Sequence, residues 1–375
     1  MAGIYFHIPY CRSKCHYCDF YESNNIKTVN QLVNSEIEEL TLRKNYLDNQ
    51  LIETIYFGGG TPSILSIAQL NDLLGEVMNN YTVSDDCEIT LEANPEDLTF
   101  DYLKSLSSTK INRLSIGIQS FNDDTLLFLG RKHGTQKLEE TIKNAQNFGF
   151  FNISLDLIYG IPGMSFDNYI NSVKSVLNLN VQHISAYALT IEKNTYFYKL
   201  LKTNRLTEVA DDVVITHFNS TIDLLAENGY VHYEVSSFAI EGYRSRHNSS
   251  YWNDKHYLGI GPSAHSYNGV SRQWNVNSTK NYCLKLSNGQ NYYEVEVLTE
   301  IDKYNEYVLL KLRTVEGLSK SYISNYFNHT INSYFLDEVF KLSNEQYIIN
   351  SGDNLMLTKK GILISDFIIR KLFFV

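Results

Sequence analysis

Residues 11–18 read Cys-Arg-Ser-Lys-Cys-His-Tyr-Cys, which places three cysteines at the spacing C-x3-C-x2-C. The segment directly follows an apolar run at residues 4–8 that is typical of a β-strand. Thiolate sulfur is a soft ligand that suits iron or zinc. A structural zinc site usually has four ligands, often from paired C-x2-C arms. Three clustered thiolates can instead hold a [4Fe–4S] cluster and leave one iron free for a ligand that is not protein.

The other two cysteines do not extend this group. Cys87 and Cys283 are isolated and lie within or beside apolar runs. We interpret both as small buried hydrophobic residues. A disulfide within residues 11–18 is a weak alternative, because three cysteines so close together in a cysteine-poor chain indicate a shared ligand.

The composition limits the class of protein. The chain has 375 residues, of which 43% are hydrophobic, so the sequence predicts one large domain and a smaller one. Its 32 basic and 42 acidic residues give a net charge of −10, which disfavours a nucleic-acid partner. We expect no signal peptide before the first predicted strand, and no apolar run is long enough to cross a membrane. Because cysteines are also few, we expect a cytoplasmic location.

Strand-like and helix-like patterns alternate over about the first 230 residues. The predicted strands are residues 4–8, 52–57, 87–92, 113–118, 153–159 and 183–189. Helical periodicity lies between them, at residues 29–47, 66–80, 135–148 and 166–177. This order predicts βαβ units and a parallel sheet. Six units are too few for a closed eight-stranded barrel, so the sequence predicts an α/β fold with a partial, open (β/α)6 barrel of the TIM type.

The pattern changes towards the C-terminus. A predicted helix at residues 207–228 leads to a strand at 231–239, and residues 241–267 read as a loop rich in Gly, Ser, Asn and His. Helices and a strand–turn–strand piece at residues 347–358 then predict a small, mostly helical domain that resembles a winged helix. The predicted division is a core at 1–235, a connecting region at 236–294 and an accessory domain at 295–375. The accessory domain has no dense basic stripe, which favours packing or partner contact over DNA binding.

Polar residues gather where the predicted strands end. The glycine-rich segment 58–62 follows the second strand, and Glu92 ends the third. Gln119 ends the fourth, whereas Asp156 lies inside the fifth. In parallel α/β barrels the carboxyl ends of the strands carry the chemistry, so one barrel mouth should collect these groups and the cysteines. Glycine lets the backbone approach a ligand closely, and the planar guanidinium of Arg131 could clamp a carboxylate.

Several segments resemble known families. The cysteine spacing resembles the signature of the radical S-adenosylmethionine (SAM) superfamily, in which three cysteines hold a [4Fe–4S] cluster and its open iron binds SAM. A closer resemblance is to the oxygen-independent coproporphyrinogen-III oxidase family, and it runs from residue 4 to about residue 268. It rests on YFHIPYC at residues 5–11, CHYCDF at 15–20, FGGGTPS at 57–63, NRLSIGIQSF at 112–121 and DLIYGIP at 156–162.

This resemblance implies ligands for both cofactors. The cluster would be held by Cys11, Cys15 and Cys18. The open iron would bind the amino and carboxylate groups of SAM. The positions that match the SAM-binding residues of the family are Tyr5, Tyr17, Gly59, Gly60, Thr61, Glu92, Gln119, Arg131 and Asp156.

Two departures favour one branch of that family. The dehydrogenase carries a fourth cysteine two residues after the third, whereas residues 18–20 read Cys-Asp-Phe. The dehydrogenase also has an N-terminal extension that closes over substrate, and here the cysteine segment begins at residue 11. Both features resemble the heme-chaperone branch, HemW, whose H-N-x-x-Y-W motif reads His-Asn-Ser-Ser-Tyr-Trp at residues 247–252.

The chemistry of this motif suits heme. A neutral imidazole binds heme iron axially, a tyrosinate can do the same, and an indole offers a flat apolar face. The resemblance therefore predicts heme contact by His247, Tyr251 and Trp252. His256 and His265 are rival iron ligands.

The resemblance implies a heme chaperone that binds heme and a SAM-liganded cluster and transfers heme to acceptor proteins such as respiratory enzymes. The alternative is the oxygen-independent coproporphyrinogen III dehydrogenase, which carries out an oxidative decarboxylation in porphyrin biosynthesis. A radical SAM enzyme that modifies RNA is disfavoured by the net charge of −10. Whether SAM is cleaved stays open. Two further hypotheses are a homodimer that shields the cysteine segment and contact with a membrane surface.

Overall fold

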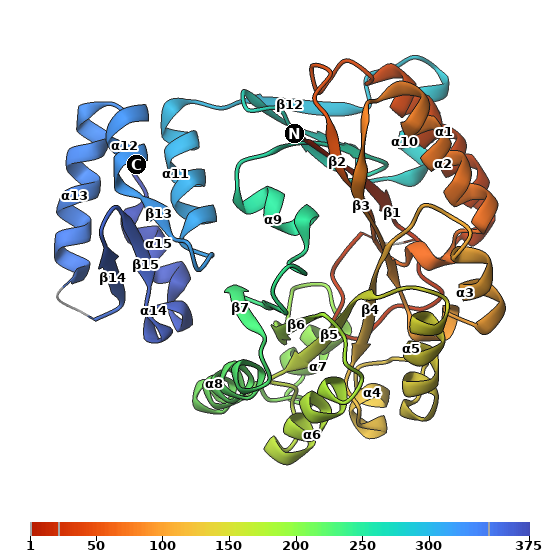
Figure 1. The fold of residues 1–375 in the computed structure, drawn as a ribbon, viewed down its shortest axis with the longest axis horizontal. Coiled ribbons are helices and arrows are strands. Elements are labelled where there is room, and N and C mark those ends of the chain that lie inside the picture. The colour runs from red at the N-terminus through yellow and green to blue at the C-terminus, as the bar shows by residue number, and fades with distance from the viewer. Residues whose placement is uncertain (1, 22, 344–345) are drawn as a thin grey trace.

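The computed structural model describes residues 2–21, 23–343 and 346–375. Its main feature is a sheet of twelve strands in the order β12-β11-β10-β9-β1-β2-β3-β4-β5-β6-β8-β7 (Figure 1). Six neighbouring strands in the middle are parallel and follow chain order, which confirms the predicted βα units. These strands are β1 (Ala2–Ile8), β2 (Ile52–Gly59), β3 (Val83–Ala93), β4 (Arg113–Gln119), β5 (Asn152–Tyr159) and β6 (His183–Ala188).

Helices connect these strands and lie along the outside of the curved sheet (Figure 1). In one of them, α2, Ser66 accepts a hydrogen bond from the backbone N–H of Gln69, and the Gln69 side chain accepts one from the backbone N–H of Ser66. Buried apolar residues three or four apart, from Leu70 to Val77, then face the sheet. Within the described residues, no helix combines the length and the apolar character that crossing a bilayer requires. The helices are α1 (Val29–Leu42), α2 (Ile67–Asn80), α3 (Phe100–Leu106), α4 (Asp123–Phe128), α5 (Leu138–Asn147), α6 (Phe166–Leu177), α7 (Tyr196–Lys202) and α8 (Asp211–Glu227).

The sheet stays open because further strands extend it at both ends. Beyond β6, the predicted strand at residues 231–239 is an antiparallel hairpin of β7 (Val231–Glu234) and β8 (Ser237–Ala239). At the other end, β9 (His256–Ile260) pairs parallel with β1. The antiparallel strands β10 (His265–Tyr267), β11 (Ser271–Asn275) and β12 (Tyr293–Val297) follow, with α10 (Thr279–Ser287) between the last two.

The predicted loop at residues 241–267 is wrong. This stretch contains α9 (Arg246–Trp252), β9 and β10. The glycines of this stretch make its strands look like a loop in the sequence. At least one of these glycines is required by packing. A Cβ atom on Gly259 would lie 2.0 Å from the backbone oxygen of His265, so only glycine fits where β9 and β10 meet.

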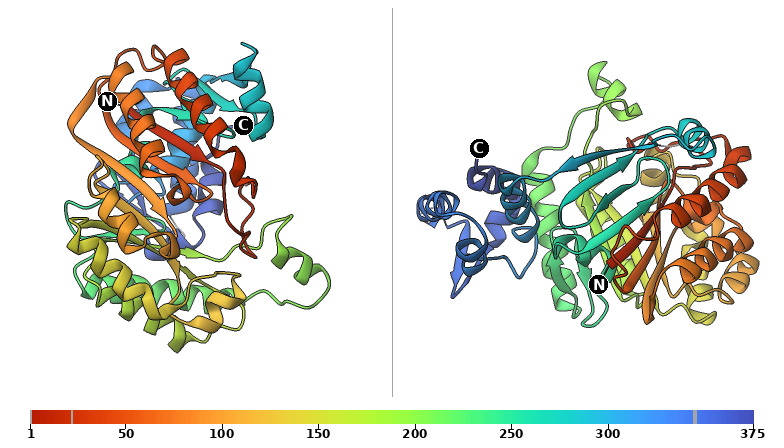
Figure 2. Two further views of the ribbon diagram at one scale, coloured as in Figure 1. Left: turned by 90° about the vertical axis from the view of Figure 1, so that its right-hand side faces the viewer. Right: turned by 90° about the horizontal axis from the view of Figure 1, so that it is seen from above.

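The C-terminal region has a hydrophobic core of its own, formed by buried side chains from Tyr304 to Leu372. A three-stranded antiparallel sheet, ordered β13-β15-β14, packs with helices and lies to one side of the main sheet (Figure 2). The predicted strand–turn–strand piece is confirmed as β14 and β15. The elements are α11 (Glu300–Lys311), β13 (Leu318–Ser319), α12 (Lys320–Tyr326), α13 (His329–Ser343), β14 (Ile348–Ser351), β15 (Asn354–Leu357), α14 (Lys359–Leu363) and α15 (Ser365–Leu372).

Candidate functional site

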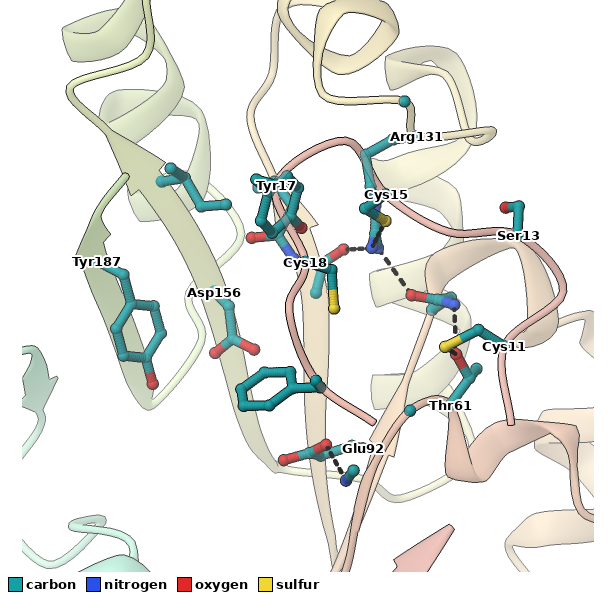
Figure 3. Close-up of a pocket in the computed structure, with 18 of the residues that line it drawn as sticks. Cys11, Ser13, Cys15, Tyr17, Cys18, Thr61, Glu92, Arg131, Asp156 and Tyr187 are labelled. Carbon is teal, nitrogen blue, oxygen red and sulfur yellow. Dashed lines mark hydrogen bonds between the residues drawn. The ribbon is translucent and has the colours of Figure 1, made fainter. Parts of the chain in front are cut away.

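A cavity of about 490 Å³ opens where the parallel strands end, at the predicted barrel mouth. We call it the cysteine cavity, because Cys11, Cys15 and Cys18 line it (Figure 3). Eight of the nine residues predicted to bind SAM line the same cavity, and Tyr5 does not. The eight are Tyr17, Gly59, Gly60, Thr61, Glu92, Gln119, Arg131 and Asp156.

The three cysteines are half-buried on one loop, and no described pair of cysteines forms a disulfide. The Cys11 sulfur lies 3.4 Å from the Thr61 hydroxyl, and the Arg131 guanidinium donates to the Cys15 sulfur at 3.5 Å. Among the described residues, no three His, Cys, Asp or Glu side chains converge closely enough to hold one metal ion. A four-iron cluster binds each thiolate through a different iron, so it suits three soft ligands spread over one loop.

Cys87 and Cys283 are buried and lie outside this cavity, as predicted. Burial raises the pKa of the Cys87 thiol to about 12, which keeps this side chain neutral. The structure therefore separates the five cysteines into three at the mouth and two that serve packing.

Arg131 is fixed in place by more than the cysteine loop. Its second guanidinium nitrogen donates to the Asn94 side-chain oxygen at 2.7 Å and to the Gly117 backbone oxygen at 2.6 Å. The charge of Arg131 thus lies beside Cys15, where it would stabilise a thiolate. The sequence suggested Arg131 as a carboxylate clamp and missed Asn94, although Asn94 follows Glu92 closely in the same segment.

Two half-buried carboxyl groups, Glu92 and Asp156, lie beside the cysteine loop (Figure 3). Glu92 accepts hydrogen bonds from the Tyr56 hydroxyl at 2.7 Å and from the backbone N–H of Gly59 at 3.2 Å. Burial raises the pKa of Glu92 to about 7 and that of Asp156 to about 6. Near neutral pH each group can therefore offer either a proton or a lone pair to a polar ligand.

The glycine-rich segment is built for close approach of the backbone. Gly59 adopts a φ of 109°, and a Cβ atom there would lie 2.9 Å from the His7 ring. A Cβ atom on Gly60 would lie 2.7 Å from the Tyr10 backbone oxygen. The segment thus packs closely against β1, and the backbone N–H groups of Gly59 and Gly60 donate to Glu92 and to the Ile8 backbone oxygen.

Tyr5 lines a second cavity of about 620 Å³, which we call the aromatic cavity. The Tyr5 hydroxyl lies 3.1 Å from Nδ1 of His7. Asp19 and Phe20 line both cavities, so the two spaces share one wall. The residues that line the aromatic cavity are Tyr5, His7, Asp19, Phe20, Tyr21, Tyr251, Asp254, Lys255, Tyr257, Ser263, His265, Tyr267, Arg272 and Leu310.

The H-N-x-x-Y-W motif forms helix α9, and its histidine is enclosed. His247 is 1% exposed, Nδ1 lies 2.8 Å from the Thr54 hydroxyl, and Nε2 lies 2.8 Å from the Tyr251 hydroxyl. Burial lowers the pKa of His247 to about 3. Of the three residues predicted to contact heme, only Tyr251 lines the aromatic cavity; Trp252 lines neither cavity.

Comparisons with known proteins agree with this geometry. The sequence profile of the radical SAM superfamily matches residues 5–176, and that of the HemN C-terminal domain matches residues 298–364. The chain resembles Escherichia coli coproporphyrinogen III oxidase (HemN), a radical SAM enzyme, with a TM-score of 0.86 and 22% identity over 99% of this chain and 90% of that one. This likeness shows the fold.

Curated relatives show the family. The chain is 32% identical to heme chaperone HemW of Lactococcus lactis, over 98% of this chain and 96% of the relative. It is 33% identical to heme chaperone HemW of Bacillus subtilis, over 98% of this chain and 97% of that relative. It is 37% identical to heme chaperone HemW of Escherichia coli, over 70% of this chain and 69% of that relative. The chain therefore belongs to the HemW heme-chaperone family of the radical SAM superfamily.

Proposed function

We propose that this protein is a heme chaperone that carries a SAM-liganded [4Fe–4S] cluster, binds heme and transfers it to acceptor proteins such as respiratory enzymes. The observation that carries the proposal is the cysteine cavity, which brings three cysteines together with most of the predicted SAM-binding residues. The relatives named as heme chaperones support the heme part.

The residues of the cysteine cavity suit both cofactors. Cys11, Cys15 and Cys18 would hold the cluster, and Arg131 would stabilise the Cys15 thiolate. When bound, the cluster supplies an open iron for the amino and carboxylate groups of SAM. The glycine-rich segment at residues 59–61 lines the cavity and could lie against the charged end of SAM, and Glu92 could accept hydrogen bonds from its ribose. Gln119 and Asp156 provide further polar groups, and the Tyr17 ring can pack against the ligand.

The heme part is tested directly by loading and transfer. After anaerobic reconstitution of the cluster, we expect ferric heme to bind saturably at about one equivalent per chain, with a shifted Soret band. Mixing the loaded protein with the apo form of a respiratory heme enzyme should restore the spectrum and activity of that enzyme. Absence of saturable heme binding would refute the proposal.

The alternative is an oxygen-independent coproporphyrinogen III dehydrogenase, and the fold likeness to HemN favours it. Residues 18–20 count against it, because the fourth cysteine of that enzyme is replaced here by Phe20. The reconstituted protein, given SAM, a reductant and coproporphyrinogen III, should form no protoporphyrinogen. Formation of that product over many turnovers would instead support the dehydrogenase.

Three further proposals accompany this function. The chain divides into a core at residues 1–235, a connecting region at 236–294 and an accessory domain at 295–375. A reducing compartment such as the cytoplasm suits the thiolates that the cluster requires. A homodimer would shield the cysteine loop, and size-exclusion chromatography with and without the cluster would test it; a monomer peak under both conditions would refute it.

A further inference from the structure

The aromatic cavity lies on the inner face of the extended sheet. Register places Tyr257 opposite Tyr267, Tyr267 opposite Arg272, and His265 opposite Trp274, so these side chains share one face. Helix α9 contacts β1, β2 and α11, and it lies between the main sheet and the C-terminal region (Figure 1). The cavity is therefore open to solvent and is bordered by the sheet on one side and by Tyr251 of α9 and Leu310 of α11 on the other. Its volume of about 620 Å³ falls within the range of cofactor and ligand pockets.

Tyrosine rings form much of the wall. The rings of Tyr251 and Tyr257 meet edge to face, with centroids 4.7 Å apart, and those of Tyr257 and Tyr267 are 6.3 Å apart. The aliphatic side chain of Leu310 completes this part of the wall. Such a surface buries a flat, largely apolar ligand while its hydroxyl groups satisfy polar atoms at the edge.

The aromatic cavity also contains an accessible imidazole. His265 is exposed, and within the described residues its ring forms no hydrogen bond. Burial by the surrounding groups and the nearby charge of Arg272 lower the pKa of His265, so the ring is neutral at physiological pH. A neutral imidazole with an unused nitrogen is the form that binds iron.

The other histidines of this part of the molecule are less suitable. Both ring nitrogens of His247 are hydrogen-bonded inside the protein. Nδ1 of His7 is hydrogen-bonded to Tyr5, and Nε2 is enclosed by protein atoms. Burial lowers the pKa of His7 to about 4, although the backbone near Tyr21 acts in the opposite direction. Nδ1 of His256 is hydrogen-bonded to Gln50, and His256 does not line the cavity.

Charged groups border the cavity and suit a ligand with carboxylates. Arg272 is held by Glu306 at 2.5 Å through Nε, which leaves the other guanidinium nitrogens for a second anion. Lys255 is exposed at the rim. Asp19 and Asp254 also line the space and offset part of this positive charge, so the two cations act on a ligand at short range only.

We infer that the aromatic cavity binds heme and that His265 is the axial ligand of its iron, whereas His247 is a positioning residue. The macrocycle packs against the tyrosine rings, and Arg272 and Lys255 face the propionates. His247 acts through Tyr251, because its hydrogen bonds to Thr54 and Tyr251 hold that ring at the cavity. This inference rests on the proposed function, since it assigns the site of the heme that a chaperone carries.

The test separates iron ligation from binding of the macrocycle. Full-length wild-type protein and the variants His265→Ala, His265→Gln and His247→Ala are titrated with ferric heme and, in parallel, with iron-free protoporphyrin IX. His329→Ala is the matched control, because His329 is exposed on α13 and does not line the aromatic cavity. Soret absorbance and electron paramagnetic resonance report the iron ligand, and quenching of the protein's tyrosine fluorescence by the porphyrin reports binding of the macrocycle.

We expect both His265 variants to lose heme affinity about tenfold or more and to lose the wild-type Soret band, while porphyrin affinity stays within about twofold. Free imidazole should restore the Soret band in His265→Ala. The His247→Ala protein should bind both ligands about tenfold more weakly but keep the wild-type iron spectrum at saturation. Circular dichroism of each variant confirms that the fold is intact.

Two results would overturn the inference. If His265→Ala titrates like wild type while His247→Ala alone loses the iron spectrum and regains it with imidazole, His247 is the ligand and the proposed function stands. If all variants keep the wild-type iron spectrum, the ligand lies elsewhere in the chain. Wild-type protein that binds no heme refutes the proposed function itself.

Discussion

The two cavities of this protein differ in how their functional groups are held. In the cysteine cavity, Arg131 and Glu92 are each fixed by several hydrogen bonds, including bonds to the backbone. In the aromatic cavity, His265 forms no hydrogen bond with the described residues, and ring contacts dominate the wall. The first arrangement suits cofactors that stay in place, because preorganised polar contacts favour tight binding. The second suits a cargo that must leave, because His265 is not held in advance by hydrogen bonds to the protein.

The largest expected effect is loss of the cluster without loss of heme binding. The Cys15→Ser variant should lose its cluster after reconstitution, because a hydroxyl is a poor ligand for iron in this setting. It should still bind heme saturably, since Cys15 does not line the aromatic cavity. Iron and sulfide analysis and a heme titration provide the measurements. Cys283→Ser, a buried cysteine outside both cavities, should keep the cluster. Loss of heme binding together with the cluster would show that the two cavities act as one site.

The pH dependence of stability tests the electrostatics of the cysteine cavity. Burial raises the pKa of Glu92 from 4.5 to about 7, so the folded state binds this proton more tightly than the unfolded chain. The resulting stabilisation is complete below pH 4.5 and is lost as the pH rises to about 7, a total of about 3 kcal/mol. In urea unfolding of the protein without cofactors, Glu92→Gln should lose less free energy of unfolding than wild type between pH 5 and pH 8.

Asp156 acts in the same direction, because burial raises its pKa to about 6. For that reason the comparison is between variant and wild type, and not between one protein at two pH values. Parallel pH profiles for Glu92→Gln and wild type would show that Glu92 titrates normally.

Substitution of two glycines tests whether the close contact between Gly59 and His7 affects both cavities. Gly59→Ala should destabilise the protein by about 2 kcal/mol, because its φ of 109° is unfavourable for alanine and the new Cβ meets the His7 ring. Binding of both SAM and heme should weaken, because Gly59 lines the cysteine cavity and the displaced His7 ring lines the aromatic cavity. Gly75→Ala, in open space within α2, should stabilise by about 0.5–1 kcal/mol. Unfolding in urea gives both values, and equal effects would contradict this account.

The smallest effect concerns the rim of the aromatic cavity. Lys255→Gln should weaken heme binding about threefold at low ionic strength and less at high salt, because an exposed charge is readily screened. Lys280→Gln, exposed on α10 and away from the cavity, should have no effect. A loss of heme affinity that does not depend on salt would contradict this account. It would indicate that Lys255 acts through packing and not through its charge.

The core of the fold could be predicted because its strands are continuous apolar runs separated by amphipathic helices. All six predicted parallel strands exist, and their order in the sheet follows the chain. The extension was missed because β9 (His256–Ile260) contains Gly259 and pairs with β1 (Ala2–Ile8), a partner far away in the sequence. Such a pairing leaves no local signal in a sequence, whereas each βα unit does.

The two cavities were predictable to different degrees for the same reason. The residues of the cysteine cavity lie in short motifs, each at the end of a strand, so the periodicity of the sheet places them together. The aromatic cavity is lined by residues of β1, the cysteine loop, α9, β9, β10, β11 and α11, and only the fold brings these segments together. His265 could be named from sequence as a rival ligand, but its accessibility and the enclosure of His247 could not.

The wall shared by the cavities has a thermodynamic consequence. Residues 19 and 20 border both spaces, and Phe20 is 65% exposed, so a ligand in either cavity would contact the same two residues. Whatever factor the assembled cluster contributes to heme affinity, bound heme must contribute the same factor to retention of the cluster. If the aromatic cavity holds heme as inferred above, occupancy of one site would then be sensed at the other through residues 19 and 20.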